Sequence, residues 1–231
     1  MKVFAGTSKG VFALEAGGAR QVLHSRGVRD LVRLDGNLFA GTGAGLYVSE
    51  DDGESWQCVA LEDREIWQVR SAGNGIYYAG TQPAGLFRSD DAGNTWREVE
   101  SFANAPESAD WCVPVKPPLP GRARALVIDR EDANRMWVGV EVGGIMRTED
   151  GGTSWQLDLP GNNPDLHMMY AHPEQAGVLF ASTGYGRADG VAEMIEGNAG
   201  VFRSDDHGAT WHYAWKGITP RYSRPMCIDE R

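Results

Sequence analysis

A short pattern that recurs four times is the feature that most constrains this chain. Its form is [Ser/Thr]-x-Asp-x-Gly-x-[Ser/Thr]-Trp, and its four copies begin at Ser49, Ser89, Thr148 and Ser204. Five shared positions that recur four times in 231 residues are not a chance event. The pattern therefore predicts a fold built from repeated structural units.

The residue types of the pattern indicate a tight turn between two strands. Glycine tolerates a positive φ, and an aspartate side chain accepts hydrogen bonds from the N–H groups of a turn. The tryptophan is expected to begin the next strand and to cover the end of the hairpin. The spacing lacks the acidic positions of a calcium loop, so no metal site is expected. We predict a structural role for Asp51, Gly53, Trp56, Asp91, Gly93, Trp96, Asp150, Gly152, Trp155, Asp206, Gly208 and Trp211.

The pattern resembles the Asp box, or BNR repeat, of sialidases, sortilin-type receptors, xyloglucan hydrolases and photosystem II stability factors. The resemblance implies an all-β fold, a β-propeller of four-stranded blades joined by Asp-box hairpins. It also implies that the boxes lie on the face away from any active site. Cytosolic BNR-repeat proteins of this kind commonly continue for further blades, so a ring of about five blades and a chain truncated from six or seven are both open.

Alternating apolar segments around the boxes divide residues 1–231 into the blades of one β-propeller domain. Four full blades are predicted, over residues 28–62, 66–103, 122–161 and 164–217. Residues 1–27 are a partial blade, which a strand from 222–231 is expected to complete, closing the ring and removing a free sheet edge. Wider box spacings indicate inserted loops at 101–121 and 185–199, both expected on the face opposite the boxes.

Composition argues against several classes of partner. The formal net charge is −10 and no Lys/Arg cluster is present, which argues against nucleic acid and anionic membranes. The three cysteines are too few for a disulfide framework and lack metal-site spacing. No cofactor is expected. The sequence contains no apolar segment typical of a signal peptide or a membrane span, so a cytoplasmic location is expected.

Alignment of the five predicted first strands places one residue of each at the same height near the channel mouth. These residues are Arg29, Trp67, Arg124, His167 and Arg224. Such a set of cations would attract a carboxylate or phosphate, and Trp111 in the first inserted loop is a further candidate for ligand binding. The alternative is structural, because Asp30, Glu65, Glu141 and Asp165 are available as ion-pair partners between blades.

The favoured function is a non-catalytic propeller that binds a small anion, such as an acidic sugar, or a protein partner at the channel mouth. An assembly or stability factor is a third possibility, by analogy with the photosystem II stability propellers. Propellers host binding and catalysis alike, so the fold does not choose among these functions.

The remaining alternative is a glycoside hydrolase, sialidase-like or otherwise exo-acting. The candidate catalytic residues are Glu141, Tyr185 and Asp110. Possible carboxylate partners of Glu141 are Asp110, Asp189, Glu193 and Glu196. A hydrolase of this kind needs two carboxylates about 5 to 10 Å apart across a cleft. The three candidate arginines would have to imitate a sialidase triad, but no Arg-Ile-Pro motif accompanies them.

Overall fold

The computed structural model describes residues 2–184, 197–214 and 216–217. The chain divides into two compact units, Met1–Glu98 and Val99–Arg231, which are taken one at a time below. Two predicted features, the closing strand at 222–231 and most of the second inserted loop, lie outside the described residues. No helix in the described part of the chain is both long and apolar enough to cross a membrane.

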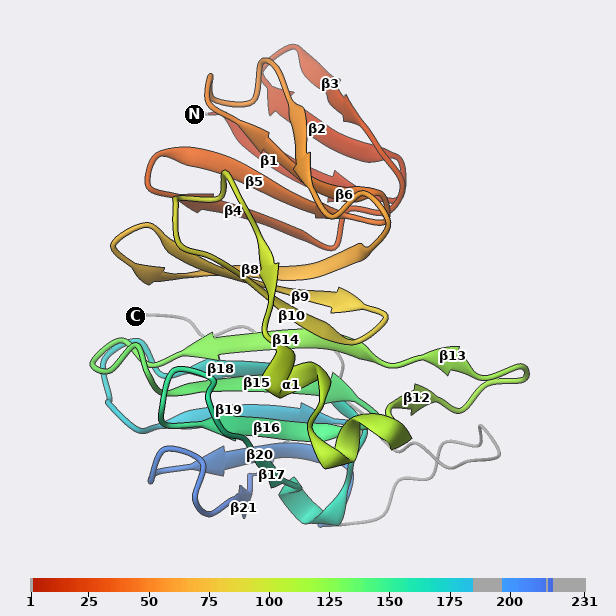
Figure 1. The fold of residues 1–231 in the computed structure, drawn as a ribbon. Helices are drawn as coiled ribbons and strands as arrows, with labels where there is room; N and C mark the ends of the chain where they lie inside the picture. Colours follow the sequence, from red (N-terminus) through yellow and green to blue (C-terminus); the bar gives the residue numbers. More distant parts are fainter. Residues whose placement is uncertain (1, 185–196, 215, 218–231) are drawn as a thin grey trace. The chain divides into compact units, whose positions relative to one another are not determined.

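The first unit contains three antiparallel sheets whose strands pair in sequence order (Figure 1). The first sheet consists of β1 (Val3–Thr7), β2 (Gly10–Glu15) and β3 (Gly18–His24). The second consists of β4 (Asp30–Leu34), β5 (Asn37–Thr42), β6 (Gly45–Ser49) and β7 (Gln57–Ala60). The third consists of β8 (Glu65–Gly73), β9 (Ile76–Gln82), β10 (Gly85–Ser89) and β11 (Arg97–Glu98).

The second unit contains two more four-stranded antiparallel sheets. It begins with α1 (Glu100–Ala103), the short helix η1 (Pro106–Asp110) and a hairpin of β12 (Cys112–Val113) and β13 (Leu119–Pro120). One sheet consists of β14 (Arg122–Ile128), β15 (Met136–Glu141), β16 (Gly144–Thr148) and β17 (Gln156–Asp158). After η2 (Pro160–Asn162), the other consists of β18 (Leu166–Ala171), β19 (Leu179–Thr183), β20 (Gly200–Ser204) and β21 (His212–Tyr213). The all-β prediction, with blades of four strands, is confirmed.

Each box forms the same turn between the third and fourth strands of a sheet. In the first box, Asp51 accepts hydrogen bonds from the Ser55 N–H at 2.8 Å and from the Ser55 hydroxyl at 2.5 Å. The Ser49 hydroxyl donates to Asp51 and accepts from the Gly53 N–H, both at 2.8 Å. The Ser55 hydroxyl and N–H are the main reason that the pKa of Asp51 falls to about 2. The prediction for the tryptophan was wrong by one residue, since each fourth strand begins just after it.

The same hydrogen bonds recur in the other three boxes, on Asp91, Asp150 and Asp206. In each of these boxes, the hydroxyl of the residue four positions after the aspartate donates a hydrogen bond to it. This hydrogen bond is the largest cause of the lowered pKa of the aspartate. A carboxylate that accepts several hydrogen bonds is stabilised in its charged form. The repeat in the sequence is thus a repeat of one turn.

The apolar core of each unit lies between the faces of consecutive sheets. In the first unit, Phe39 of the second sheet meets Tyr77 of the third edge to face, with ring centroids 5.5 Å apart. In the second unit, Trp137 and Leu166 from neighbouring sheets share one buried cluster. Because core residues alternate with residues of the opposite face along a strand, each sheet can pack on both sides.

A glycine in the second strand lets neighbouring sheets approach closely. A Cβ atom at Gly41 would lie 3.0 Å from Ile66 Cγ2, and one at Gly139 would lie 1.9 Å from Leu166 Cδ2. Real Cβ atoms cannot come so close to a neighbouring carbon. An apolar residue at the start of the following sheet's inner strand therefore occupies the space that the glycine leaves open.

The first inserted segment packs along the sheet β14–β17. The Ser101 hydroxyl donates to the Gly152 carbonyl of the third box and accepts from Trp155 Nε1 at 3.2 Å. The Phe102 ring lies 5.2 Å from the Trp155 ring and 4.8 Å from the Trp111 ring, centroid to centroid. The expectation that this whole insertion lies opposite the boxes was therefore wrong, because α1 contacts a box directly.

Candidate functional site

One irregularity repeats at the inner strand of three sheets. The pairing register shifts at Trp67 in β8, at Arg124 in β14 and at His167 in β18. These are positions at which the sequence alignment placed its candidate ligand-binding residues. A β-bulge adds one unpaired residue and turns its side chain away from the regular alternation of the strand.

In the first unit, Arg29 and Trp67 lie against each other. The Arg29 guanidinium carbon is 4.7 Å from the centroid of the Trp67 ring, and Arg29 Nη2 is 3.3 Å from Glu65 Oε2. The side chains of Arg29 and Glu65 are 40% and 37% exposed. Asp30 instead pairs with Arg70 at 2.7 Å. Exposed pairs of this kind contribute about 0 to 1 kcal/mol, so Arg29 is held only loosely.

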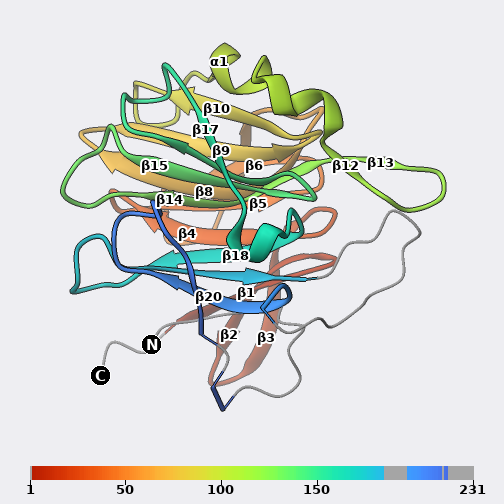
Figure 2. The ribbon, with the colours of Figure 1, turned by 90° about the horizontal axis from the view of Figure 1, so that it is seen from below.

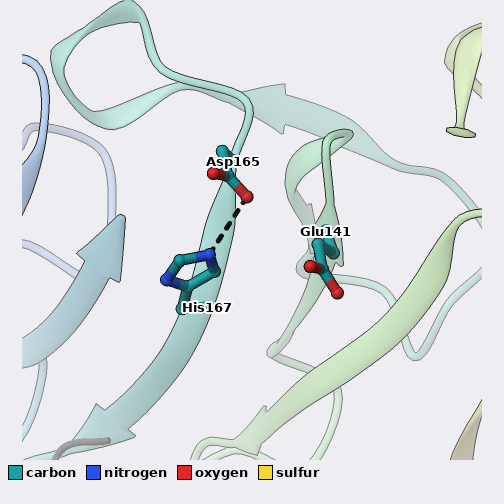
Figure 3. Close-up of side chains that lie close together, drawn as sticks. All are labelled: Glu141, Asp165 and His167. Atoms are coloured by element: carbon teal, nitrogen blue, oxygen red, sulfur yellow. Dashed lines mark ion pairs between the residues drawn. The ribbon is translucent and has the colours of Figure 1, made fainter. Parts of the chain in front are cut away.

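In the second unit, five charged or titratable side chains form what we call the buried charge cluster. Its members are Arg122, Arg124, Glu141, Asp165 and His167. Glu141 Oε2 accepts from Arg122 Nη1 and from Arg124 Nη1, both at 2.9 Å. His167 Nε2 lies 3.2 Å from Asp165 Oδ1, as Figure 3 shows. One polar atom from each of Glu141, Asp165 and His167 lies within 4.8 Å of the other two.

Backbone contacts between neighbouring sheets hold this cluster in place. Glu141 and Asp165 form an antiparallel bridge across the two sheets. The Gly184 N–H donates to the Asp165 carbonyl at 2.8 Å, and a Cβ at Gly184 would lie 2.3 Å from His167 Cε1. Asn163, which is almost fully buried, accepts from the Asp165 N–H at 2.9 Å. The backbone therefore closes directly over the Asp165–His167 pair.

The charge balance of the cluster limits its chemistry. Glu141, Asp165 and His167 are only 7%, 5% and 1% exposed. An oxygen–nitrogen set of this kind can ligate a metal ion, but two guanidinium groups already supply positive charge to Glu141. Buried charges are stable when they are paired and hydrogen-bonded, and this arrangement meets that condition.

The fourth box matches a known protein-family model. A family model described as the BNR/Asp-box repeat matches residues 202–213, which include the fourth box. The chain thus carries a BNR/Asp-box repeat at this position. No curated protein sequence matches it.

Solved structures resemble this chain over most of its length. The extracellular domain of BT3049, a proposed hybrid two-component system from B. thetaiotaomicron, has a TM-score of 0.73 and 17% identity. The match covers 100% of this chain and 29% of the BT3049 chain. The GH74 xyloglucanase from Xanthomonas campestris has a TM-score of 0.69 and 17% identity, and covers 91% of this chain and 35% of its own. YCF48 from Cyanidioschyzon merolae has a TM-score of 0.50 and 16% identity, with coverages of 83% and 62%.

These likenesses show the fold, which is that of β-propeller blades. The chain spans about a third of the length of BT3049's extracellular domain and of the xyloglucanase. A xyloglucanase, an extracellular domain of a two-component system and YCF48 share this fold, so the function of this chain has to be argued from its own residues.

The remaining candidates from the sequence are dispersed. Asp110 is exposed at the end of η1, whereas Trp111 is only 8% exposed and packs on Phe102. The other acidic and aromatic candidates of the second insertion, and the last candidate arginine, lie outside the described residues: Tyr185, Asp189, Glu193, Glu196 and Arg224.

Sequence reasoning missed Arg122 and Asn163. Arg122 lies two positions before Arg124, which is the bulged residue, and both reach the same Glu141 oxygen. The bulge that brings them together leaves no mark in the alternation of apolar residues. Asn163 stands between a short helix and β18, where an amide side chain that bonds the backbone two residues on is a common turn residue, and that signal was available.

Proposed function

We propose that this protein is a non-catalytic BNR/Asp-box propeller whose function is to bind a protein partner. One observation carries the proposal: the described candidate cations are joined to acids of the same unit. Arg124 is paired with Glu141, and His167 lies beside Asp165. Arg29 likewise lies beside Glu65. Cations committed to such pairs stabilise the blades and do not form an open, convergent anion site.

Glycoside hydrolysis fits this geometry poorly. One carboxylate oxygen of Glu141 lies within 4.8 Å of one of Asp165, which is compatible with the spacing of about 5 Å between the carboxylates of a retaining hydrolase. However, both side chains are more than nine-tenths buried, which leaves no room for a sugar ring between them. Glu141 Oε2 is also held by the guanidinium groups of both Arg122 and Arg124, so this oxygen is already engaged within the fold.

The absence of catalysis is tested with the purified chain. Xyloglucan oligosaccharides and sialosides serve as substrates, because the resemblance and the structural likeness point to these two hydrolase classes. We expect no turnover above that of Glu141→Gln. The matched control is Asp51→Asn, which alters a box turn and leaves the cluster intact. Hydrolysis that Glu141→Gln abolishes and Asp51→Asn retains would overturn the proposal.

The binding function is tested separately. The full chain is used as bait, each captured protein is purified, and its affinity for the chain is measured by calorimetry. A single purified partner with a dissociation constant of about 1 μM or below, and a saturable one-site isotherm, supports the proposal. If every captured protein fails to bind after purification, the proposal of a protein partner is wrong.

A small anion is the second candidate, and one observation favours it. Arg29 is 40% exposed, is stacked on Trp67 and lies 3.3 Å from its acidic neighbour, so its guanidinium can turn toward a ligand. The probe is inorganic phosphate, followed by changes in tryptophan fluorescence. Quenching that saturates in the wild type and is absent in Arg29→Gln would favour this candidate, and identical responses would exclude it.

A further inference from the structure

The hairpin of β12 and β13 carries an unusual sequence at its tip. Four of the eight residues from Val113 to Pro120 are proline, in the order Val-Pro-Val-Lys-Pro-Pro-Leu-Pro. Two overlapping Pro-x-x-Pro runs lie there, one from Pro114 to Pro117 and one from Pro117 to Pro120. We call residues 112–120 the proline hairpin. Both views of the second unit show it extending past the ends of the neighbouring sheet strands (Figures 1 and 2).

The proline hairpin is exposed at its tip and anchored by buried residues at its base. Residues 115–120 are all exposed, and Val115 and Leu119 have exposed fractions of 43% and 42%. At the base, Trp111 and Gly121 are buried, and the Gly121 N–H donates to the Trp111 carbonyl at 3.1 Å. Exposed apolar side chains gathered at one projecting point typically mark an interaction surface.

The backbone of the tip is constrained as well. Cys112 pairs with Pro120 and Val113 pairs with Leu119, while the Val115 N–H donates to the Val113 carbonyl at 2.8 Å. Prolines restrict the chain further, because each fixes its own φ. A segment that is already ordered loses little conformational entropy on binding, so its apolar contacts are retained in the affinity.

The chemistry of the tip defines the partner that it fits. Prolyl rings and short aliphatic side chains pack on flat aromatic faces, which is how Pro-x-x-Pro segments bind grooves lined by Trp and Tyr. Lys116 is the only charged residue in the proline hairpin, in a chain whose formal net charge is −10. A carboxylate at the rim of the groove would therefore complement Lys116 and set the orientation of the hairpin.

We infer that the proline hairpin is the docking element of this protein, and that it inserts into an aromatic-lined, acid-rimmed groove of a protein partner. This inference rests on the proposed binding function and specifies the surface that performs it. It assigns no role to the buried charge cluster, so substitutions in the two places have separable effects.

The test uses the full chain and two hairpin variants, Leu119→Ser and Lys116→Glu. The matched control is Leu14→Ser, an exposed leucine of the first unit whose exposed fraction of 40% is close to that of Leu119. All three positions are on the surface, and circular dichroism with thermal unfolding checks that each variant is folded. The first probe is a panel of purified SH3 and WW domains, whose grooves are lined by aromatic residues, titrated by calorimetry.

A second arm places a photo-crosslinking residue at position 115 and identifies the proteins captured. Each is then purified and titrated with the wild type and the variants. We expect a probe or partner that binds the wild type and the control equally and binds each hairpin variant at least about tenfold more weakly. Substitution of an aromatic residue in the groove of that partner should produce the same loss.

Two results overturn the inference. One is equal affinity of the wild type and both hairpin variants for every protein that binds, which would leave the proposed binding function intact but place its surface elsewhere. The other is no binding in either arm. Failure of the proposed function itself has different signatures, which are glycoside hydrolysis that depends on Glu141 and a full-chain bait from which no captured protein binds after purification.

Discussion

Replacing Gly139 by alanine tests whether the glycine of the second strand sets the approach of neighbouring blades. The backbone of Gly139 is not in the left-handed region, so alanine adds a methyl group without backbone strain. That carbon would lie 1.9 Å from Leu166 Cδ2 and 3.0 Å from Ala125 Cβ. Carbon atoms at rest are about 3.5 to 4.0 Å apart. Leu166 is fully buried and has no solvent-facing position to move to.

The expected loss of stability follows from two opposing contributions. Extra atoms in a packed core cost about 1 to 3 kcal/mol, and an overlap this large belongs at the upper end of that range. Alanine is itself favoured over glycine inside a strand by about 0.5 to 1 kcal/mol. We therefore expect Gly139→Ala to lower the free energy of unfolding by about 2 kcal/mol.

Urea unfolding followed by tryptophan fluorescence measures this loss. Gly41→Ala should cost less, because its new carbon would be 3.0 Å from Ile66 Cγ2, and Gly17→Ala is the control, since nothing lies within 4 Å of its Cβ position. In the double variant with Leu166→Ala, the new methyl group enters the space left by leucine. The two losses should therefore sum to more than the loss in the double variant. Wild-type stability of Gly139→Ala, or simple additivity, would refute the steric argument.

Three further predictions concern the box turns and the buried charge cluster. The pKa of Asp51 in the folded chain, about 2, is below its ordinary value near 4, so its contribution is full above pH 4 and is lost as the pH falls to 2. Asp51→Asn should thus show a shallower fall of the urea midpoint between pH 4 and 2 than the wild type does. Ala92 has a φ of 58°, and Ala92→Gly should raise the free energy of unfolding by about 0.5 kcal/mol in thermal unfolding, since relief of the left-handed backbone exceeds the added chain entropy. Glu141→Gln removes the carboxylate that two arginines share and should lower the free energy of unfolding, measured in urea, by about 3 kcal/mol. An unchanged free energy of unfolding would contradict the argument from burial.

The blades could be predicted from sequence because their signals are local. A strand alternates with period two, and the box fixes a turn through residues within a few positions of one another, such as Ser49, Asp51 and Ser55. Repetition then removes the ambiguity of any one segment.

The contacts of the candidate site could be predicted only as alternatives. The sequence named Glu65, Glu141 and Asp165 as possible partners for the cations, and the structure pairs them with Arg29, Arg124 and His167 respectively. Which of the two alternatives held depended on distances that local patterns do not record, because Glu65 lies far along the chain from Arg29 and because Arg124 and His167 stand at bulges. The position of α1 against the third box could not be predicted from the sequence either, because it depends on the tertiary packing of Phe102.

The bulges explain why one position of the inner strand carries such different residues. At Trp67, Arg124 and His167 the extra residue stands outside the ladder, so its side chain does not have to match the alternation that packs the sheets. Residues next to the bulges, such as Ile66 and Leu166, do have to match that alternation, and they are fully buried. A substitution at a bulge therefore changes the charge or shape of that side chain and leaves the packing between the sheets unaltered. In the described blades the bulged residues make ion pairs or a cation–π contact within the fold, so they are engaged in the blades, and the proline hairpin is the surface left for a partner.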